Sequence, residues 1–261
     1  MESTQAQLAE PFQRTTVSFV RRDNRLRPRM QRSWDKHHQR LLIDVPRVQA
    51  SMSVAPGFTL DAMRDFGRVA PLVVEIGSGT GDAVIHGAQA SPGTNFLAVE
   101  VYRPGLGATL AKVVRHNLTN VRLVQADAVQ VLEHMLMAES VEEIWVFFAD
   151  PWHKLRHHKR RLVNPGFAEL AASRLTRGGT LRLATDWEDY ARQMCDVLAA
   201  CGSFTNPYGG GPTSQQASGD PTSFGPEPGF APRFEGRVMT RFEQKALALG
   251  RPVYDLELRR P

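Results

Sequence analysis

The stretch that decides the fold is residues 72–81, Leu-Val-Val-Glu-Ile-Gly-Ser-Gly-Thr-Gly, a short apolar run that ends in alternating glycines. An apolar run of this length predicts a buried strand. Glycines allow the backbone to turn sharply after the strand and to approach a ligand closely. A helix at 81–90 would then point its free backbone N–H groups at the turn. Alone, this strand–turn–helix unit is a weak signal, because dinucleotide sites use a similar device.

Outward from this unit, apolar strands alternate with helices. Further strands are expected at 95–101, 121–126, 143–149, 180–185 and 253–258, and helices at 105–117, 128–137, 165–175, 189–201 and 240–249. Such alternation is typical of a parallel sheet covered on both faces. We therefore predict an α/β, Rossmann-like fold with a mostly parallel seven-stranded sheet and helices on both faces.

The two ends of the chain differ in composition from this core. Residues 1–50 are predicted to form a basic N-terminal arm, with a short helix near 32–42, because 14–40 holds nine Lys or Arg and only two acids. Two interpretations of this arm stay open. It is a solvated tail, or it has a function and either contacts nucleic acid or lies over the active site. Residues 51–261 are predicted to form one domain, in which the Gly- and Pro-rich stretch 206–233 is a loop insertion.

Bulk composition limits the class of protein. Lys plus Arg is 32 and Asp plus Glu is 27, a formal charge of +5 that permits a polyanionic partner. Cys195 and Cys201 have neither disulfide-framework nor metal-ligand spacing, which fits a reducing compartment. No apolar run approaches the ~18 residues of a membrane helix, and the polar N-terminus has no signal-peptide core. We expect a cytoplasmic monomer without membrane contact.

Three acidic residues are expected at neighbouring strand ends. Glu75, Glu100 and Asp127 would lie beside the crevice where open α/β sheets bind ligands. A carboxylate at Glu100 can accept hydrogen bonds from a ribose diol, and Asp127 can meet an adenine amino group. Each acid alone could equally be a helix cap or a solvated turn. Together they suit a cationic ligand such as S-adenosylmethionine and would repel the pyrophosphate of NAD.

A second group of polar residues follows the strand at 143–149. Pro151 restricts Asp150 to an extended backbone, so Asp150 should point into the crevice mouth, and Trp152 either stacks on a base or fills the loop. Residues 154–161, Lys-Leu-Arg-His-His-Lys-Arg-Arg, are either a solvated face or a phosphate-binding strip. No acid or cysteine completes a metal site with His157 and His158. With Asp186, Asp150 could read the donor-rich edge of guanine.

With these motifs the chain resembles the bacterial-type tRNA (guanine-N7)-methyltransferases. The resemblance runs from about Arg14 to the C-terminus, and the motifs that carry it are 74–81, 150–161, 185–186 and 240–243, with 18–22 near the start. It implies a methyltransferase fold that uses S-adenosylmethionine to methylate N7 of guanine at position 46, in the variable loop of tRNA. It also implies tRNA as the partner.

The resemblance implies a role for each matching residue. Asp150 is the expected active-site aspartate. The cofactor-binding residues are Glu75, Gly77, Gly79, Gly81, Glu100, Asp127 and Ala128. The substrate-binding residues are Lys154, Asp186, Thr240, Arg241, Phe242 and Glu243. The RNA-contacting residues are Arg156, His157, His158, Lys159, Arg160 and Arg161.

The chain departs from the family pattern at three positions. Ala149 and His153 stand where the family usually has Pro, and Ala246 where it usually has Gly. The first two could shift Asp150 slightly. Two other functions stay open: an adenine amino-methyltransferase, although only one proline follows Asp150, and a non-catalytic RNA-binding protein on a methyltransferase scaffold. An NAD dehydrogenase would need a different glycine spacing.

Overall fold

The computed structural model describes residues 25–48, 52–209 and 229–261. The first 24 residues of the expected basic arm, including the motif at 18–22, lie outside this range. So do residues 210–228 of the expected loop insertion.

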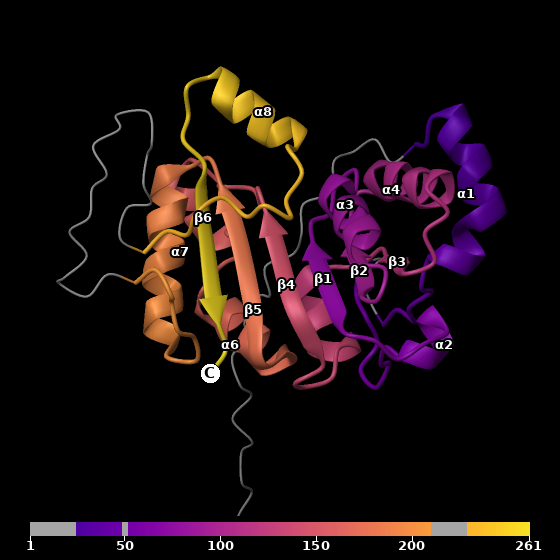
Figure 1. Cartoon of the computed structure of the whole chain (residues 1–261), viewed down its shortest axis with the longest axis horizontal. Helices are drawn as coiled ribbons and strands as arrows, with labels where there is room; N and C mark the ends of the chain where they lie inside the picture. Colours follow the sequence, from indigo (N-terminus) through magenta and orange to yellow (C-terminus); the bar gives the residue numbers. More distant parts are fainter. Residues whose placement is uncertain (1–24, 49–51, 210–228) are drawn as a thin grey trace, which may run out of the picture.

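The described residues form one six-stranded sheet (Figure 1). Its strands are β1 (Leu72–Ile76), β2 (Asn95–Val99), β3 (Val121–Val124), β4 (Val141–Phe147), β5 (Leu175–Thr185) and β6 (Tyr254–Arg259). The strand order is β3-β2-β1-β4-β5-β6, and every neighbouring pair is parallel except the antiparallel β5–β6. The predicted α/β class and mostly parallel sheet are confirmed.

The predicted count of seven strands is wrong for the described residues. Among the described residues, two isolated bridges pair with the outer edge of β6, Thr205 to Arg259 and Ala231 to Asp255. Pro207 and Pro232 follow these bridge residues closely and have no N–H to donate to a ladder. Pairing at this edge therefore stays local instead of extending into a strand.

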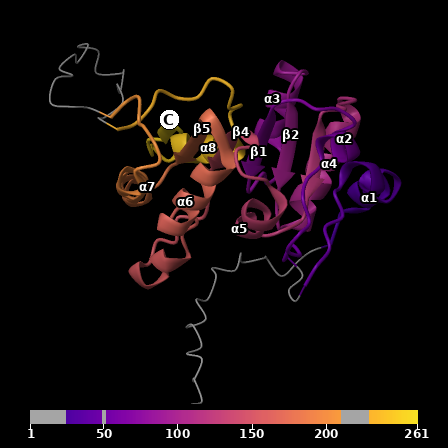
Figure 2. The same cartoon turned by 90° about the horizontal axis from the view of Figure 1, so that it is seen from below.

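Helices cover both faces of the sheet (Figure 2). They are α1 (Pro28–Leu41), α2 (Ala62–Phe66), α3 (Asp82–Ala90), α4 (Arg103–Arg115), α5 (Ala128–Gln130), the π-helix η1 (Val131–Met135), the 3₁₀ helix η2 (Leu155–Arg160), α6 (Pro165–Arg174), α7 (Glu188–Cys201) and α8 (Arg241–Ala248). Two elements, α2 and η2, are absent from the sequence-based prediction. No helix in the described ranges has the length and apolar character to span a bilayer.

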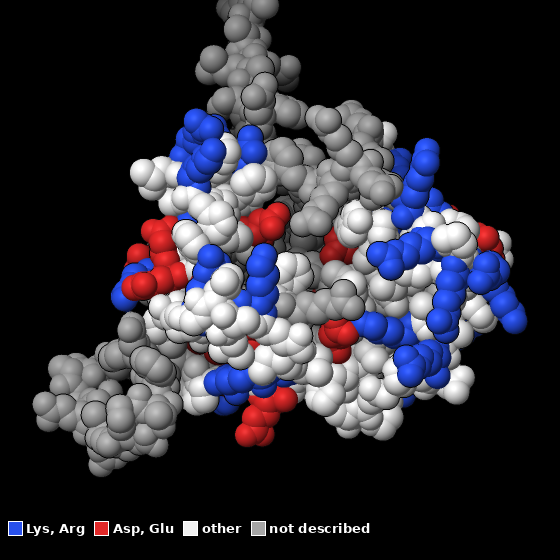
Figure 3. Space-filling model, turned by 90° about the horizontal axis from the view of Figure 1, so that it is seen from above, with Lys and Arg blue, Asp and Glu red and all other residues white. Residues whose placement is uncertain are grey.

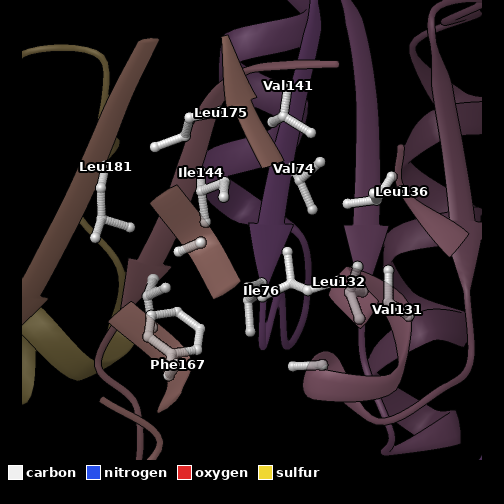
Figure 4. Close-up of a cluster of buried hydrophobic side chains, with 14 of the residues drawn as sticks. Val74, Ile76, Val131, Leu132, Leu136, Val141, Ile144, Phe167, Leu175 and Leu181 are labelled. Atoms are coloured by element: carbon white, nitrogen blue, oxygen red, sulfur yellow. The ribbon is translucent and has the colours of Figure 1, made fainter. Parts of the chain in front are cut away.

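The core has two layers because strand side chains alternate between the faces. Val74, Ile76 and Ile144 pack with η1, α6 and α7 in one cluster (Figure 4). Val73 and Ala98 pack with α1, α3 and α4 in the other. All five residues of β1 are buried, which explains why the strand reads as a continuous apolar run around Glu75.

Helix α1 is packed on the second layer. Its Trp34 and Leu41 are buried, and the chain after it donates a 2.8 Å hydrogen bond from Ile43 N–H to the Leu123 carbonyl at β3. Residues 28–43 of the basic N-terminal segment thus contribute to the core. Where the domain begins stays a prediction.

Candidate active site

The strand order reverses between β1 and β4. From β1 the chain adds β2 and β3 on one side, and β4 adds β5 on the other. Open α/β sheets bind ligands outside the carboxyl ends of strands at such a reversal. In Figure 3, which looks down on this edge, acidic residues lie around a central hollow and basic residues lie further out.

The glycine turn after β1 is fastened to β2. Gly77, Gly79 and Gly81 all have positive φ, at 70°, 54° and 76°, which other residues adopt at a cost. The N–H groups of Gly77 and Ser78 donate to the Val99 carbonyl at 2.9 and 3.1 Å. Helix α4 approaches so closely that a Cβ on Gly105 would lie 2.5 Å from the Gly79 carbonyl oxygen. The hydrogen bonds to β2 and the contact with α4 therefore restrict the backbone of the turn to one conformation.

Glu75 lies beneath this turn instead of on its surface. Its side chain is buried, and Oε2 accepts a 2.9 Å hydrogen bond from the Val84 N–H in the first turn of α3. Burial raises the pKa of Glu75 to about 8, against the lowering effect of that hydrogen bond. At pH 7 Glu75 is therefore largely the neutral acid.

Glu100 joins the turn to the start of α4. Its two oxygens accept 2.8 Å hydrogen bonds from the N–H groups of Gly79 and Tyr102. Burial raises the pKa of Glu100, and the charge of Asp150 raises it further. Strands β2 and β4 both pair in parallel with β1, so Glu100 and Asp150 follow the carboxyl ends of strands on either side of it.

Asp127, after β3, is the third carboxylate. One oxygen accepts a 2.9 Å hydrogen bond from the Val129 N–H and so caps α5, whose first residue is Ala128. Only 8% of Asp127 is exposed. Asp127 therefore caps a helix, one of the two roles considered for it, and it also lies just after the end of β3, as expected.

The residues present fit S-adenosylmethionine. The carboxylates of Glu100 and Asp127 favour its positive charges, Glu75 would add a third on losing its proton, and the glycine turn keeps side chains away from the crevice. Ser78 Oγ is buried and is the one such side-chain atom without a hydrogen-bond partner across the described ranges. A buried hydroxyl without a partner costs free energy, and a polar ligand would supply the missing hydrogen bond. The sequence offered only the identity of Ser78, not its burial.

The turn after β4 has an unusual backbone. Phe148 and Trp152, on either side of Asp150, have positive φ values of 57° and 46°. Tertiary contacts hold them: Phe148 N–H donates to the Ala184 carbonyl at 2.8 Å, and Arg161 Nε donates to the Pro151 carbonyl at 2.8 Å. Strain kept in this way clusters at functional sites.

The basic residues after Trp152 divide into exposed and buried ones. Lys154, Arg156 and Lys159 are exposed, whereas His157, His158 and Arg160 are half-buried. The Arg160 guanidinium lies 5.0 Å from the Trp152 ring centre, and His157 packs edge-on against the same ring at 5.8 Å. Trp152 therefore packs against two of these basic residues.

Arg161 does not belong to the exposed strip with which the sequence pattern grouped it. Arg161 is buried, with 1% of its surface exposed. Its guanidinium donates to Asp189 at 2.6 Å and to Gln193, both on α7, and lies 4.9 Å from the Tyr190 ring centre. Arg161 thus ties the turn that carries Asp150 to α7.

The expected substrate-binding residues lie in two places. Lys154 belongs to the exposed strip, and Asp186, after β5, pairs with Arg251 at 3.3 Å. Thr240 caps α8 by accepting the Glu243 N–H at 3.1 Å. Exposed Phe242 stacks on Phe148, with ring centres 6.4 Å apart, which brings α8 against the turn after β4. The side chain of Arg241 lies outside the described part of the structure.

Glu243, predicted to bind the substrate, lies in the interior, as Arg161 does. It is 1% exposed, and its carboxylate pairs with Arg233 at 2.6 Å and Arg237 at 3.1 Å. Hydrogen bonds to these two arginines lower the pKa of Glu243 against the raising effect of burial. Arg237 also bonds Asp255 of β6, so Glu243 fixes α8 to the sheet.

The chain is similar in sequence to known methyltransferases. The family described as "Putative methyltransferase" matches residues 69–218. The tRNA (guanine-N(7)-)-methyltransferase of Paenarthrobacter aurescens is 47% identical, over 94% of this chain and 91% of that protein. The enzyme of the same name from Cutibacterium acnes is 46% identical, over 95% and 84%.

Among solved structures, the 16S rRNA methyltransferase KamB shares the fold. Its TM-score is 0.52 at 14% identity, over 78% of this chain and 95% of that chain. The match therefore concerns the architecture alone. Sequence identity near one half over almost the whole length decides the closer relationship: the chain belongs to the tRNA (guanine-N(7)-)-methyltransferase family.

Proposed function

We propose that this protein transfers the methyl group of S-adenosylmethionine to N7 of a guanine in tRNA, at position 46 of the variable loop. The relatives' names support the reaction and substrate. The observation that carries the proposal is that Glu100, bonded to the glycine turn, and Asp150 follow the carboxyl ends of β2 and β4, which flank β1 where the strand order reverses. A methyl donor and an acceptor base need to be adjacent, and this crevice has residues suited to each.

The cofactor would be held by the first three strand ends. Glu100 is suited to the ribose hydroxyls, and Asp127 and Ala128 to the adenine. Glu75 lies beneath the turn of Gly77, Gly79 and Gly81, where ionisation would offset a positive charge on the ligand. The bound cofactor supplies an electrophilic methyl group on a sulfonium.

The acceptor needs no strong general base. Guanine N7 has a lone pair in the ring plane, so it would bond to the methyl carbon without losing a proton while the methyl–sulfur bond breaks and S-adenosylhomocysteine leaves. Asp150 would accept hydrogen bonds from the amino edge of the guanine, and its negative charge would stabilise the cationic 7-methylguanine as it forms. Positioning and exclusion of water would supply most of the rate enhancement. The fixed backbone on either side of Asp150 serves that positioning.

The remaining residues would bind the RNA. Lys154, Arg156, His157, His158, Lys159 and Arg160 are suited to phosphates beside the crevice. Asp186, after β5, and Thr240, Arg241 and Phe242, at the start of α8, would bind the substrate, while Arg161 and Glu243 would act by holding the turn and α8 in place. A tRNA substrate implies a cytoplasmic enzyme, and one chain contains every residue of the proposed site, so a monomer suffices.

The test is to incubate purified protein with radiolabelled S-adenosylmethionine and unmodified tRNA, followed by nucleoside analysis. Label should appear in 7-methylguanosine. Asp150→Asn should reduce turnover by about 10²–10³, the scale for losing one electrostatic contact in the transition state, with much less effect on cofactor binding. A tRNA in which guanine 46 is replaced should accept no label.

The other outcomes identify the alternatives. Label in a methylated adenine would make the protein an adenine amino-methyltransferase. Cofactor and tRNA binding without label in any nucleoside would make it a non-catalytic RNA-binding protein. An Asp150→Asn variant with normal turnover would remove Asp150 from the reaction.

A further inference from the structure

Helix α1 has a basic stripe that the proposed site does not use. Arg29, Arg32, Lys36 and Arg40 are all exposed. At about 100° per residue they fall within an arc of roughly 80°, and they span about 16 Å along the helix. The stripe faces away from Trp34 and Leu41, which are buried. We call these four residues the α1 basic stripe.

The helix that carries the stripe is firmly held. Trp34 packs in the core and stacks on His38 at 5.9 Å, and the Arg103 guanidinium lies 5.1 Å from the Trp34 ring centre. Before the helix, Leu26 lies against Gly107 so closely that a Cβ there would be 2.6 Å from Leu26 Cδ2. A rigid helix presents its charges in a fixed arrangement and loses little entropy when it binds.

The charge of the stripe is not balanced nearby. No ion pair joins any of the four residues to an acid within the described ranges. Asp35, the acid of α1, lies to one side and accepts a 2.7 Å hydrogen bond from Gln31. Surface basic residues in soluble proteins are usually interspersed with acids, so four without partners on one stripe favour a polyanionic ligand.

The stripe and the strip after β4 lie on opposite sides of the crevice. Helix α1 packs on α4. The first residue of α4, Arg103, lies three positions after Glu100 in the chain and contacts Trp34 of α1. The strip after β4 is anchored to α7, towards the other end of the sheet. In Figure 3, basic residues gather on the right, the side of α1 and α4. A ligand larger than the crevice could contact both flanks.

We propose that the α1 basic stripe is a second tRNA-binding surface, which holds phosphates of the RNA backbone while the target guanine enters the crevice. The proposal rests on the proposed tRNA methyltransferase function. RNA duplexes are recognised mainly through phosphates, 2′-hydroxyls and shape, and a short row of cations on a fixed helix matches that chemistry. Two separated contacts would also set the orientation of the tRNA.

The test compares two double variants by tRNA binding, the salt dependence of that binding, and methyl transfer. Arg32→Gln with Lys36→Gln removes two charges from the stripe. Arg177→Gln with Arg259→Gln removes two exposed charges from β5 and β6, at the end of the sheet away from α1, and is the control for loss of charge, although Arg259 pairs with Glu257 at 3.1 Å. Cofactor binding and thermal unfolding report whether each variant is folded.

The stripe variant should weaken tRNA binding about tenfold, raise KM for tRNA, and reduce the slope of log K against log salt by about 2, one per phosphate contact. The control should match the unaltered protein in all three. Equal effects of both variants, or no effect of the stripe variant in a protein that methylates tRNA, would overturn the inference. Absence of methyl transfer by the unaltered protein would instead contradict the proposed function.

Discussion

At the residue scale, Glu75 couples folding to pH. Its pKa is about 8 in the fold because it is buried, against an ordinary value of 4.5. The folded protein therefore keeps a proton that the unfolded chain releases, and stability falls as the pH rises from about 4.5 to about 8. Above that range Glu75 is ionised in both the folded and the unfolded protein, so its ionisation no longer makes stability depend on pH.

Glu75→Gln should remove this pH dependence. The amide keeps an acceptor for the Val84 N–H and stays neutral, so the variant should be more stable than the unaltered protein at pH 7, by on the order of a few kcal/mol. Urea unfolding at several pH values measures it, with the exposed Glu142→Gln as control. Parallel pH profiles for Glu75→Gln and the unaltered protein would show that Glu75 ionises normally.

At the element scale, the glycine turn depends on its contact with α4. Gly105→Ala should weaken S-adenosylmethionine binding at least tenfold and cost about 1–3 kcal/mol of stability, because the new Cβ meets the Gly79 carbonyl. Gly93→Ala is the control, since a Cβ there has nothing within 4 Å. Calorimetric titration and thermal unfolding measure both effects. Similar behaviour of the two variants would mean that α4 yields easily.

In the basic segment 154–161 after β4, a buried residue and an exposed residue should respond differently to substitution. Arg161→Gln should lower the unfolding midpoint and turnover together, because it releases the Pro151 carbonyl from α7. Lys159→Gln should weaken tRNA binding a few-fold and leave the midpoint unchanged, since Lys159 is exposed. Unfolding curves and tRNA titrations separate the two. A stable Arg161→Gln variant with weak tRNA binding would instead make Arg161 an RNA contact.

These elements also show how far sequence reasoning reaches. Strand β1 and its glycine turn were predictable, because burial and positive φ restrict which residues can occur there. The positive φ of Phe148 and Trp152 was not, since distant partners at Ala184 and Arg161 hold it. Arg161 and Glu243 are charged residues in polar stretches, a pattern that indicates exposure, and only their tertiary ion pairs explain their burial.

At the scale of the whole molecule, charge is distributed according to ligand. The net charge is +5, yet three acidic residues, Glu100, Asp127 and Asp150, follow the carboxyl ends of β2, β3 and β4. Raising salt from about 50 to about 200 mM should therefore lower kcat/KM for tRNA at least tenfold, while cofactor binding in the partly buried crevice changes far less. Steady-state kinetics with either substrate varied measure this. Equal salt sensitivity for both would show that phosphate contacts contribute little.

The interrupted outer edge of β6 has a practical consequence for engineering. Thr205 and Ala231 each form a single bridge to β6, and Asn206 Nδ2 donates a 2.9 Å hydrogen bond to the Gly229 carbonyl, so described residues hold the points where the chain leaves and rejoins the sheet edge. A reporter domain or an immobilisation peptide could be grafted between these two points without shifting the strand register. The edge of the sheet thus provides a ready attachment point, remote in sequence from the residues that would handle the methyl group.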